Sequence, residues 1–304
     1  MPVVTAPDRS RPLAGILWML VTGALFVGVT AIVKHVGDRI PPAESAFLRY
    51  ALGLVFLAPM LGAMRAARPS VRDLRLFGLR GAAHGIGVIF WFFAMTDIPI
   101  AEVTAMGYLS PIFVTLGAAL FLGETLAARR IFAICAAFIG AMIILRPGLR
   151  AIEPGHLAML ANAVLFGTSY LTAKFLADRY PPSVVVGFLS ISVTIVLAPF
   201  ALANWVGPTL TETAWLALVA ALATSGHYTM TLAFRAAPVT VTQPVQFLQL
   251  LWATMLGAVA FGEAVDPFVI LGGMVILGSV IFITWREIRL KRRALTPPSN
   301  ATKY

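Results

Sequence analysis

The feature that most constrains this chain is a series of apolar runs, each about 20 residues long, that follows the sequence from end to end. An α-helix rises about 1.5 Å per residue, so about 20 apolar residues cross the roughly 30 Å hydrocarbon core of a bilayer. Ten runs are long enough, at residues 13–33, 43–64, 76–96, 101–122, 130–146, 156–176, 183–204, 214–234, 239–261 and 267–285. The sequence therefore predicts an all-α membrane protein with ten transmembrane helices.

Composition supports a membrane protein and excludes several soluble classes. Of the 304 residues, 59% are hydrophobic and 12% are charged, whereas soluble proteins carry about 25% charged residues. The net charge of +10 is explained by basic residues at the ends of membrane helices, so we expect lipid and no nucleic acid as a partner. The one cysteine, Cys135, lies in an apolar run, which excludes disulfides and cysteine-based zinc sites.

The distribution of Lys and Arg predicts the orientation of the chain. If the N-terminus is cytoplasmic, 17 basic residues fall in the tails and loops of that side and 4 fall on the other side. Cytoplasmic loops carry the excess of Lys and Arg in most multi-pass proteins. Both termini are therefore expected in the cytoplasm, with the chain in a bacterial inner membrane.

An internal repeat divides the chain in two. At an offset of 140 residues Lys34 matches Lys174, and at 139 Gly87 matches Gly226 and Glu124 matches Glu263. Each copy holds five spans, so the second copy must enter the membrane from the opposite face, and inverted repeats of this kind imply alternating access. The expected parts are a cytoplasmic tail at 1–12, repeats at 13–148 and 155–285, and a basic cytoplasmic tail at 286–304.

Four segments carry a resemblance to a known family. They are SPIFVTLGAALFLGETL at 110–126, its counterpart ATMLGAVAFGEAV at 253–265, AFLRYALG around Arg49, and GAMIILRPG at 140–148. Through them the chain resembles EamA-type members of the drug/metabolite transporter superfamily over roughly residues 13–285. The resemblance implies two inverted five-helix repeats in which the third, fourth, eighth and ninth spans move as gates. In size and layout the chain is similar to the branch that exports aromatic and neutral amino acids.

Polar and aromatic residues in the middle of spans are the candidates for substrate binding. Hydrocarbon offers polar groups no partners, so such residues face other helices or a wet path. In the ninth span Gln243 and Gln246 share one face, and the same positions of the fourth span are small or polar. A lone residue of this kind more often joins two helices than contacts a ligand, but the concentration of such residues on equivalent spans of both repeats favours a cavity. The full candidate set is Trp18, His84, Trp91, Tyr108, Asn162, Tyr170, His227, Gln243, Gln246 and Trp252.

A second set of residues is expected to have gating or structural roles. Glu124 and Glu263 follow a glycine at equivalent span ends, where Lys34 and Lys174 are possible partners. Pro111 and Pro244 interrupt the fourth and ninth spans, Gly87 and Gly226 lie at equivalent positions of the third and eighth spans, and all four are expected as helix breakers. The set is Lys34, Arg49, Gly87, Pro111, Glu124, Lys174, Gly226, Pro244 and Glu263.

Two arginines lie inside spans and need a separate explanation. Arg80 is expected to extend its long side chain to the membrane interface. For Arg49 a structural role and recognition of a substrate carboxylate both stay open. We expect no charge at the middle of the membrane, which counts against a phosphorylated substrate.

The expected function is alternating-access transport of small amphipathic metabolites. Amino acids, including aromatic ones, are the first substrate class, moved outward by uniport or exchange, because no carboxylate lies at mid-span to couple protons or sodium. The alternatives are S-adenosylmethionine, riboflavin or a nucleotide-type metabolite, or proton-coupled drug efflux. Because no catalytic motif is present, an enzyme or a receptor that does not transport ranks lower. No cofactor and no metal are expected, and both a monomer and a homodimer remain open.

Overall fold

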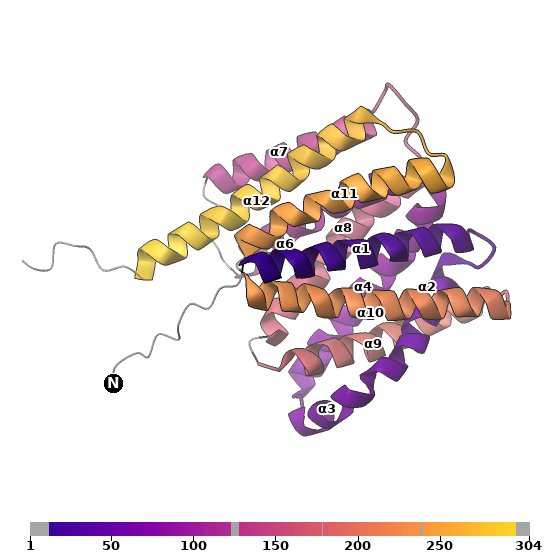
Figure 1. Ribbon diagram of the computed structural model, residues 1–304. Coiled ribbons are helices and arrows are strands. Elements are labelled where there is room, and N and C mark those ends of the chain that lie inside the picture. Colours follow the sequence, from indigo (N-terminus) through magenta and orange to yellow (C-terminus); the bar gives the residue numbers. More distant parts are fainter. Residues whose placement is uncertain (1–11, 123–127, 178, 238, 296–304) are drawn as a thin grey trace, which may run out of the picture.

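Helices account for nearly all of the part of the chain that the computed structural model describes, which is residues 12–122, 128–177, 179–237 and 239–295 (Figure 1). An isolated bridge between Pro147 and Arg150 is the β-type pairing seen there. The elements are α1 (Pro12–Val36), α2 (Pro42–Gly53), η1 (Leu54–Met60), α3 (Leu61–Ala67), α4 (Val71–Asp97), α5 (Ile100–Gly107), α6 (Ser110–Leu122), α7 (Ala128–Leu145), α8 (Pro154–Ala177), α9 (Pro182–Ala203), α10 (Leu210–Ala236), α11 (Val239–Phe261) and α12 (Pro267–Leu295).

Several of these helices have the length and hydropathy of membrane spans. Within the described residues six stretches qualify: Pro12–Val36, Pro42–Ala67, Val71–Asp97, Ile100–Phe121, Ser183–Ala203 and Pro267–Arg286. Two shorter apolar helices, Ile131–Leu145 and Leu248–Phe261, lie where further spans are expected. The helices therefore confirm a multi-pass membrane protein.

Two of the expected spans are not single regular helices. The run at 43–64 is divided into α2, the 3-10 segment η1 and α3, with Pro59 inside η1. The run at 101–122 is divided into α5 and α6, and the break at Tyr108 and Leu109 comes just before Pro111, whose nitrogen has no hydrogen to donate. In contrast, α11 is continuous through Pro244, so the interruption expected there is absent.

The ends of the helices are set by local signals in the loops. Proline is the first residue of α1, α2, α8, α9 and α12, where its missing N–H and fixed φ cost nothing. Ser70 caps α4 by accepting from the backbone N–H of Asp73, and Thr209 and Glu212 form a capping box at the start of α10. These caps set the residue at which each helix begins and so align the helices across the bundle.

All the long helices run between the same two ends of the bundle. Figure 1 places the start of α1 and the end of α12 at one end, here called the terminal end, and the opposite end is called the distal end. The loops at 37–41, 98–99, 146–153, 204–209 and 262–266 lie at the distal end.

Helices α7 and α12 pack directly against each other at one edge of the bundle. A Cβ placed on Gly140 would lie 2.7 Å from the carbonyl oxygen of Gly272, so no larger residue fits without moving a backbone. Ala133, Ala137 and Ala141 recur every four residues on α7 and are buried. This face of small residues on α7 therefore packs within the chain.

Gly87 and Gly226 are packing positions in continuous helices. A Cβ on Gly87 of α4 would lie 2.7 Å from Cδ1 of Phe166 in α8, and one on Gly226 of α10 would lie 3.2 Å from Cζ of Phe26 in α1. The interpretation of these glycines as interruptions of the helix is wrong, because α4 and α10 keep regular helical backbone through them. Glycine is needed there because the neighbouring ring occupies the space of a side chain.

Candidate functional site

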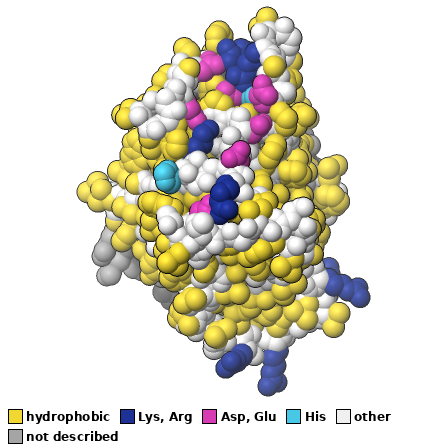
Figure 2. Space-filling view, turned by 90° about the vertical axis from the view of Figure 1, so that its right-hand side faces the viewer, with side chains coloured by type: hydrophobic (Ala, Val, Ile, Leu, Met, Phe, Trp, Pro, Cys, Tyr) yellow, Lys and Arg dark blue, Asp and Glu magenta, His cyan; other side chains and the backbone are white. Residues whose placement is uncertain are grey.

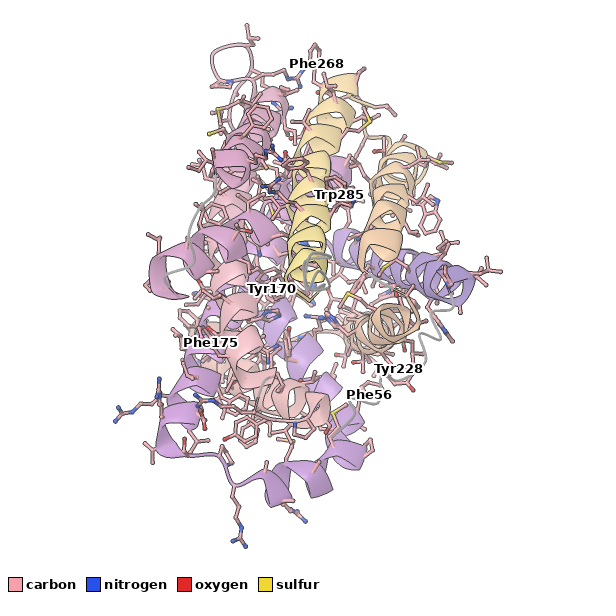
Figure 3. The ribbon with its side chains drawn as sticks, turned by 90° about the vertical axis from the view of Figure 1, so that its left-hand side faces the viewer. Phe56, Tyr170, Phe175, Tyr228, Phe268 and Trp285 are labelled. Atoms are coloured by element: carbon pink, nitrogen blue, oxygen red, sulfur yellow. The ribbon has the colours of Figure 1, made fainter. Side chains whose placement is uncertain are left out.

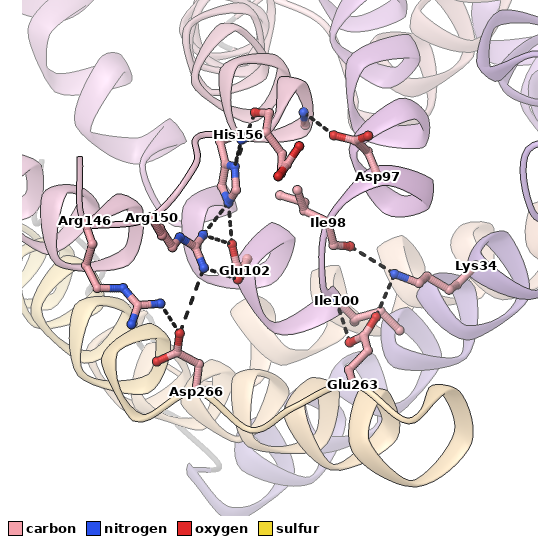
Figure 4. Close-up of polar contacts among 12 residues, drawn as sticks. Lys34, Asp97, Ile98, Ile100, Glu102, Arg146, Arg150, His156, Glu263 and Asp266 are labelled. Carbon is pink, nitrogen blue, oxygen red and sulfur yellow. Dashed lines mark hydrogen bonds and ion pairs between the residues drawn. The ribbon is translucent and has the colours of Figure 1, made fainter. Parts of the chain in front are cut away.

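A lysine and a glutamate close the distal end between α1 and α11. The Nζ of Lys34 lies 2.6 Å from Oε1 of Glu263 and donates to the carbonyl oxygen of Ile98 at 3.0 Å, while the backbone N–H of Ile100 donates to Glu263 at 3.0 Å (Figure 4). Lys34 and Glu263, which the sequence suggested as possible partners, thus form an ion pair. Of the equivalent residues, Glu124 and the side chain of Lys174 lie outside the described part of the chain.

A second ionic group at the distal end surrounds Glu102 of α5. Arg150 donates from both terminal nitrogens to Glu102, at 2.9 and 2.5 Å, and Nε2 of His156 lies 2.5 Å from the same carboxylate (Figure 4). Asp266 pairs with Arg146 and lies 4.0 Å from Arg150. The hydrogen bond to Glu102 raises the pKa of Arg150, so this arginine stays charged at every physiological pH.

Two further polar contacts complete the distal end. Arg39 pairs with Glu212, whose pKa this hydrogen bond lowers to about 2. The backbone N–H of Gly155 donates to Asp97 at 2.6 Å. Figure 2, which looks onto this end, shows acidic and basic side chains gathered together on it. The carboxylates of Glu212 and Asp97 are thus matched by a cation and by a backbone donor.

Beneath these ion pairs lies a layer of tightly packed apolar side chains. None of its members is more than 1% exposed: Met95, Ile98, Ile100, Val103, Met106 and Leu109. They come from the end of α4, the loop after it, α5 and the break before α6. Among the described residues, two successive layers therefore close the distal end. The outer layer consists of paired charges and the inner layer of packed apolar side chains.

Halfway along the bundle, α2, α4 and α8 bring basic and aromatic side chains together. Arg80 and His84 are four residues apart on α4 and so share one face of it. His84 is the middle residue of this helix of 27 residues. We call the group the central cluster and define it as Arg49, Tyr50, Arg80, His84, Phe166 and Tyr170.

The rings of the central cluster enclose His84. Its imidazole stacks on Phe166 with the centroids 4.6 Å apart and the planes within 7° of parallel. Tyr50 presents its edge at 6.2 Å, and Tyr170 lies 6.5 Å away. The hydroxyl of Ser169 lies 3.3 Å from Nδ1. Offset-stacked and edge-to-face arrangements of this kind are the preferred geometries of aromatic pairs.

The two arginines of the central cluster have no carboxylate partner among the described residues. Arg80 is 7% exposed and donates from Nη1 to the carbonyl oxygen of Val185 at 2.9 Å, while its Nε is buried with no partner. The guanidinium of Arg49 lies 4.6 Å from the centroid of Tyr50. Both arginines are close enough to His84 to interact with it electrostatically. Arg80 is held inside the bundle, so the expectation that it extends to the membrane interface is wrong. The expectation of no charge at the middle of the membrane is wrong for the same reason.

Of the members of the central cluster, Tyr170 is the exposed one. Tyr170 is 43% exposed although the rings of His84 and Phe166 adjoin it. Trp18 and Tyr228, nearer the terminal ends of their helices, are 40% and 66% exposed. Figure 3, which looks onto the terminal end, shows Tyr170 of α8 near the middle of the view. This accessibility contrasts with the sealed distal end.

Three other predicted site residues lie at contacts between helices. Asn162 is buried and donates to the carbonyl oxygen of Gly87 at 2.8 Å, which ties α8 to α4. His227 of α10 is exposed, meets Phe26 of α1 edge-to-face at 5.2 Å, and is close enough to Arg49 and Arg80 to interact with them electrostatically. Trp252 of α11 packs on α1, within 3.2 Å of where a Cβ on Gly23 would lie.

Two further candidates, Tyr108 and Trp91, are not brought into the central cluster. Tyr108 is half-buried at the break between α5 and α6, next to the backbone of Leu250. Trp91 is half-buried against its neighbour Phe92. The side chains of Gln243, Pro244 and Gln246 lie outside the described part of the structure.

Sequence reasoning missed three members of the central cluster. Tyr50 and Phe166 were not candidates because single aromatic residues are common in membrane helices. Arg80 was assigned to the interface. One signal was available: the spacing of four between Arg80 and His84 predicts that both lie on one helical face.

A hollow of about 330 Å³ on the distal surface is lined by Ile143, Arg146, Leu149, Arg150 and Phe268. Its arginines are already paired with Asp266 and Glu102. It therefore offers a ligand no unmatched charge, in contrast to the central cluster.

Comparison with known proteins identifies the family. The model of the EamA-like transporter family matches residues 13–146 and again residues 153–285. The chain belongs to the EamA-like transporter family. It is 31% identical to a riboflavin transporter of Rhizobium johnstonii over 95% of this chain and 96% of that one. A riboflavin transporter of Vibrio cholerae is 30% identical over 94% of this chain and 97% of its own length.

A more distant relative carries a different substrate name. The chain is 26% identical to an S-adenosylmethionine uptake transporter of Rickettsia prowazekii, over 90% of this chain and 94% of the relative. A solved crystal structure with 22% identity and a TM-score of 0.55, covering 90% of this chain and 96% of that one, shares the fold. The family and these relatives are transporters, so an enzyme is not favoured.

Proposed function

We propose that this protein is a carrier for a flat heteroaromatic metabolite of the riboflavin type. The observation that carries the proposal is the stack of His84 on Phe166, flanked by Tyr50 and Tyr170, halfway through the bundle. Stacking on aromatic faces is the ordinary way in which proteins hold flat rings. The riboflavin transporters among the relatives support this substrate class over amino acids, which the sequence placed first.

The architecture proposed is two inverted five-helix repeats, at 13–148 and 155–285. The two separate matches to one family model support it. So do equivalent contacts: Gly87 of the first repeat packs on Phe166 of the second, and Gly226 of the second packs on Phe26 of the first. Both glycines and both rings are pairs of positions that the internal repeat aligns. With ten spans both termini lie on one side, and the excess of Lys and Arg there supports the cytoplasm, so that the distal end faces the periplasm of a bacterial inner membrane.

The described conformation then corresponds to an inward-facing carrier. Lys34 with Glu263 and Arg150 with Glu102 close the periplasmic side, and the apolar layer lies beneath them. Tyr170, with a 43% exposed side chain, gives access from the cytoplasmic side. Exchange of the two repeats' conformations opens the distal end and closes the terminal end.

The driving force proposed is the gradient of the substrate itself. The central cluster holds no carboxylate among the residues that the structure describes, and the nearest acidic groups in α2 and α5, Glu44 and Glu102, lie in their first turns at the distal end. Carriers coupled to protons or sodium usually keep an ionisable acid along the path. The protein therefore works as a uniporter or an exchanger.

Counterflow in proteoliposomes tests the proposal. Vesicles loaded with unlabelled riboflavin are diluted into labelled riboflavin, and transient accumulation of label shows carrier-mediated exchange. Parallel vesicles use S-adenosylmethionine and tryptophan, and empty liposomes correct for leakage. We expect accumulation with riboflavin, at equal rates with and without a pH gradient. Accumulation with tryptophan alone would return the function to amino-acid transport, and accumulation driven by pH alone would refute the uncoupled mechanism.

A further inference from the structure

We infer that the central cluster is built to bind an anionic group attached to a flat ring, through the guanidinium groups of Arg49 and Arg80. This inference rests on the proposed function and deepens it. It assigns the cargo a carboxylate or a phosphate next to the ring. The two groups share the chemistry that a guanidinium recognises, namely negatively charged oxygens that accept several hydrogen bonds.

The first step of the argument is the contrast between the arginines inside the bundle and those at its ends. Arg39, Arg146, Arg150 and Arg179 each pair with a carboxylate of the chain. Arg80 is more deeply buried than any of these four, yet the structure pairs it with a backbone carbonyl oxygen alone. These four partly exposed arginines are thus neutralised by carboxylates of the chain, whereas Arg80, which is more deeply buried, is left uncompensated.

An uncompensated arginine in this position is expensive. A charged side chain at the centre of a membrane helix is costly on insertion scales, and such residues persist because they serve a function. The electrostatic neighbours of Arg80 include the hydroxyl groups of Tyr50 and Tyr170, which are neutral, and its neighbour His84 adds no negative charge. The missing counter-charge is therefore supplied by a molecule that enters the site.

The donors of Arg80 are set up for such a molecule. A guanidinium carries five N–H donors in a fixed plane. One nitrogen, Nη1, is held by the carbonyl oxygen of Val185 in α9, which fixes the plane, while Nε is buried and has no partner. Arg49 lies over the ring of Tyr50, whose edge meets His84. The cations and the ring stack are thus joined through Tyr50, so one ligand can engage both.

The inference is tested by binding three flavins to the purified full-length protein. Riboflavin is neutral, riboflavin 5′-phosphate carries a phosphate, and 10-carboxymethylflavin carries a carboxylate on the same ring. Flavin fluorescence gives the dissociation constants. Because charge-assisted hydrogen bonds contribute about 1.5–3 kcal/mol, at least one anionic flavin should bind about tenfold or more tightly than riboflavin. Which one binds better distinguishes a phosphate from a carboxylate as the natural group.

Arginine variants identify the residues responsible. Arg80→Gln and Arg49→Gln should each reduce the preference for the anionic flavin to about twofold or less, whereas Arg80→Lys, which keeps the charge, should retain part of it. Arg179→Gln is the matched control, because this arginine is 47% exposed and pairs with Asp73 far from the rings. If Arg80→Gln does not fold, Arg49→Gln and Arg80→Lys still measure the preference.

Each outcome supports or overturns the inference. Equal affinity of the wild-type protein for all three flavins overturns it while leaving the proposed function intact. If Arg80→Gln elutes as a folded protein and weakens all three flavins equally, the arginine is structural and the inference is also overturned. If none of the three flavins binds, the proposed function fails, and the inference fails with it.

Discussion

Removal of the positive charge at Lys34 should open the distal end. Its ammonium group pairs with Glu263 at 2.6 Å and with the carbonyl oxygen of Ile98 at 3.0 Å, and both charged side chains are less than one fifth exposed. A hydrogen bond to a charged group contributes about 1.5–3 kcal/mol when its partner would be left buried. Lys34→Gln should therefore shift the equilibrium between the closed and open distal end by about 10- to 100-fold.

A cysteine beneath the ion pairs reports this shift. Val103 is 1% exposed in the apolar layer under Lys34 and Glu263, so Val103→Cys should react slowly with a maleimide that cannot cross the membrane. The native Cys135 is exposed and is first replaced in Cys135→Ala. Adding the reagent to spheroplasts from outside then measures how often the distal end opens.

Arg39→Gln is the matched control for the same assay. Arg39 also pairs across the distal end, but it is 47% exposed, and exposed ion pairs contribute about 0–1 kcal/mol. Labelling of Val103→Cys should rise strongly with Lys34→Gln and little with Arg39→Gln. Equal labelling rates in the parent and in Lys34→Gln would refute the assignment of Lys34 as part of the seal.

Three further results are expected. Gly87→Ala should destabilise the protein by about 1–3 kcal/mol in thermal unfolding and Gly226→Ala by less, since the added Cβ would lie 2.7 Å from a ring in the first case and 3.2 Å in the second. His84→Ala should weaken riboflavin binding by up to about tenfold at unchanged folded yield, because one ring of the stack is lost; unchanged binding would remove it from the site. Because the pKa of Glu212 in the folded protein is about 2, below its ordinary 4.5, its pairing with Arg39 stabilises the fold fully above pH 4.5 and is lost as the pH falls towards 2. The difference in melting temperature between Glu212→Gln and wild type should therefore stay constant from pH 8 to about 5.5 and shrink below about 4.5.

The sequence predicted the membrane helices well because one property decides them. A run of apolar residues long enough to cross a bilayer must be a helix there, since no other backbone satisfies its own hydrogen bonds. Proline, glycine and capping residues then placed most helix ends. Local irregularities were harder to predict: Pro111 is preceded by a break, whereas α11 continues through Pro244, and only the packing around each proline decides between these outcomes.

The candidate site was predicted only in part because its members come from different helices. His84 and Tyr170 were found as polar or aromatic residues in mid-span. Arg49 and Arg80 each looked close to a membrane surface when counted along their own helix, and periodicity in one helix says nothing about which residues of another helix face it. The carbonyl oxygen of Val185, which holds Arg80 inside, belongs to a helix more than one hundred positions later in the chain.

Helices α7 and α12 form a pair that can serve as a fixed reference when movements of the other helices are measured. Where the backbones of Gly140 and Gly272 meet, no flexible side chain lies between them to absorb a rotation. Spectroscopic labels placed on the outer faces of these two helices should keep one separation through the whole transport cycle. Distances measured from that pair to α1, α4, α8 and α10 would then separate real helix movement from tumbling of the whole molecule.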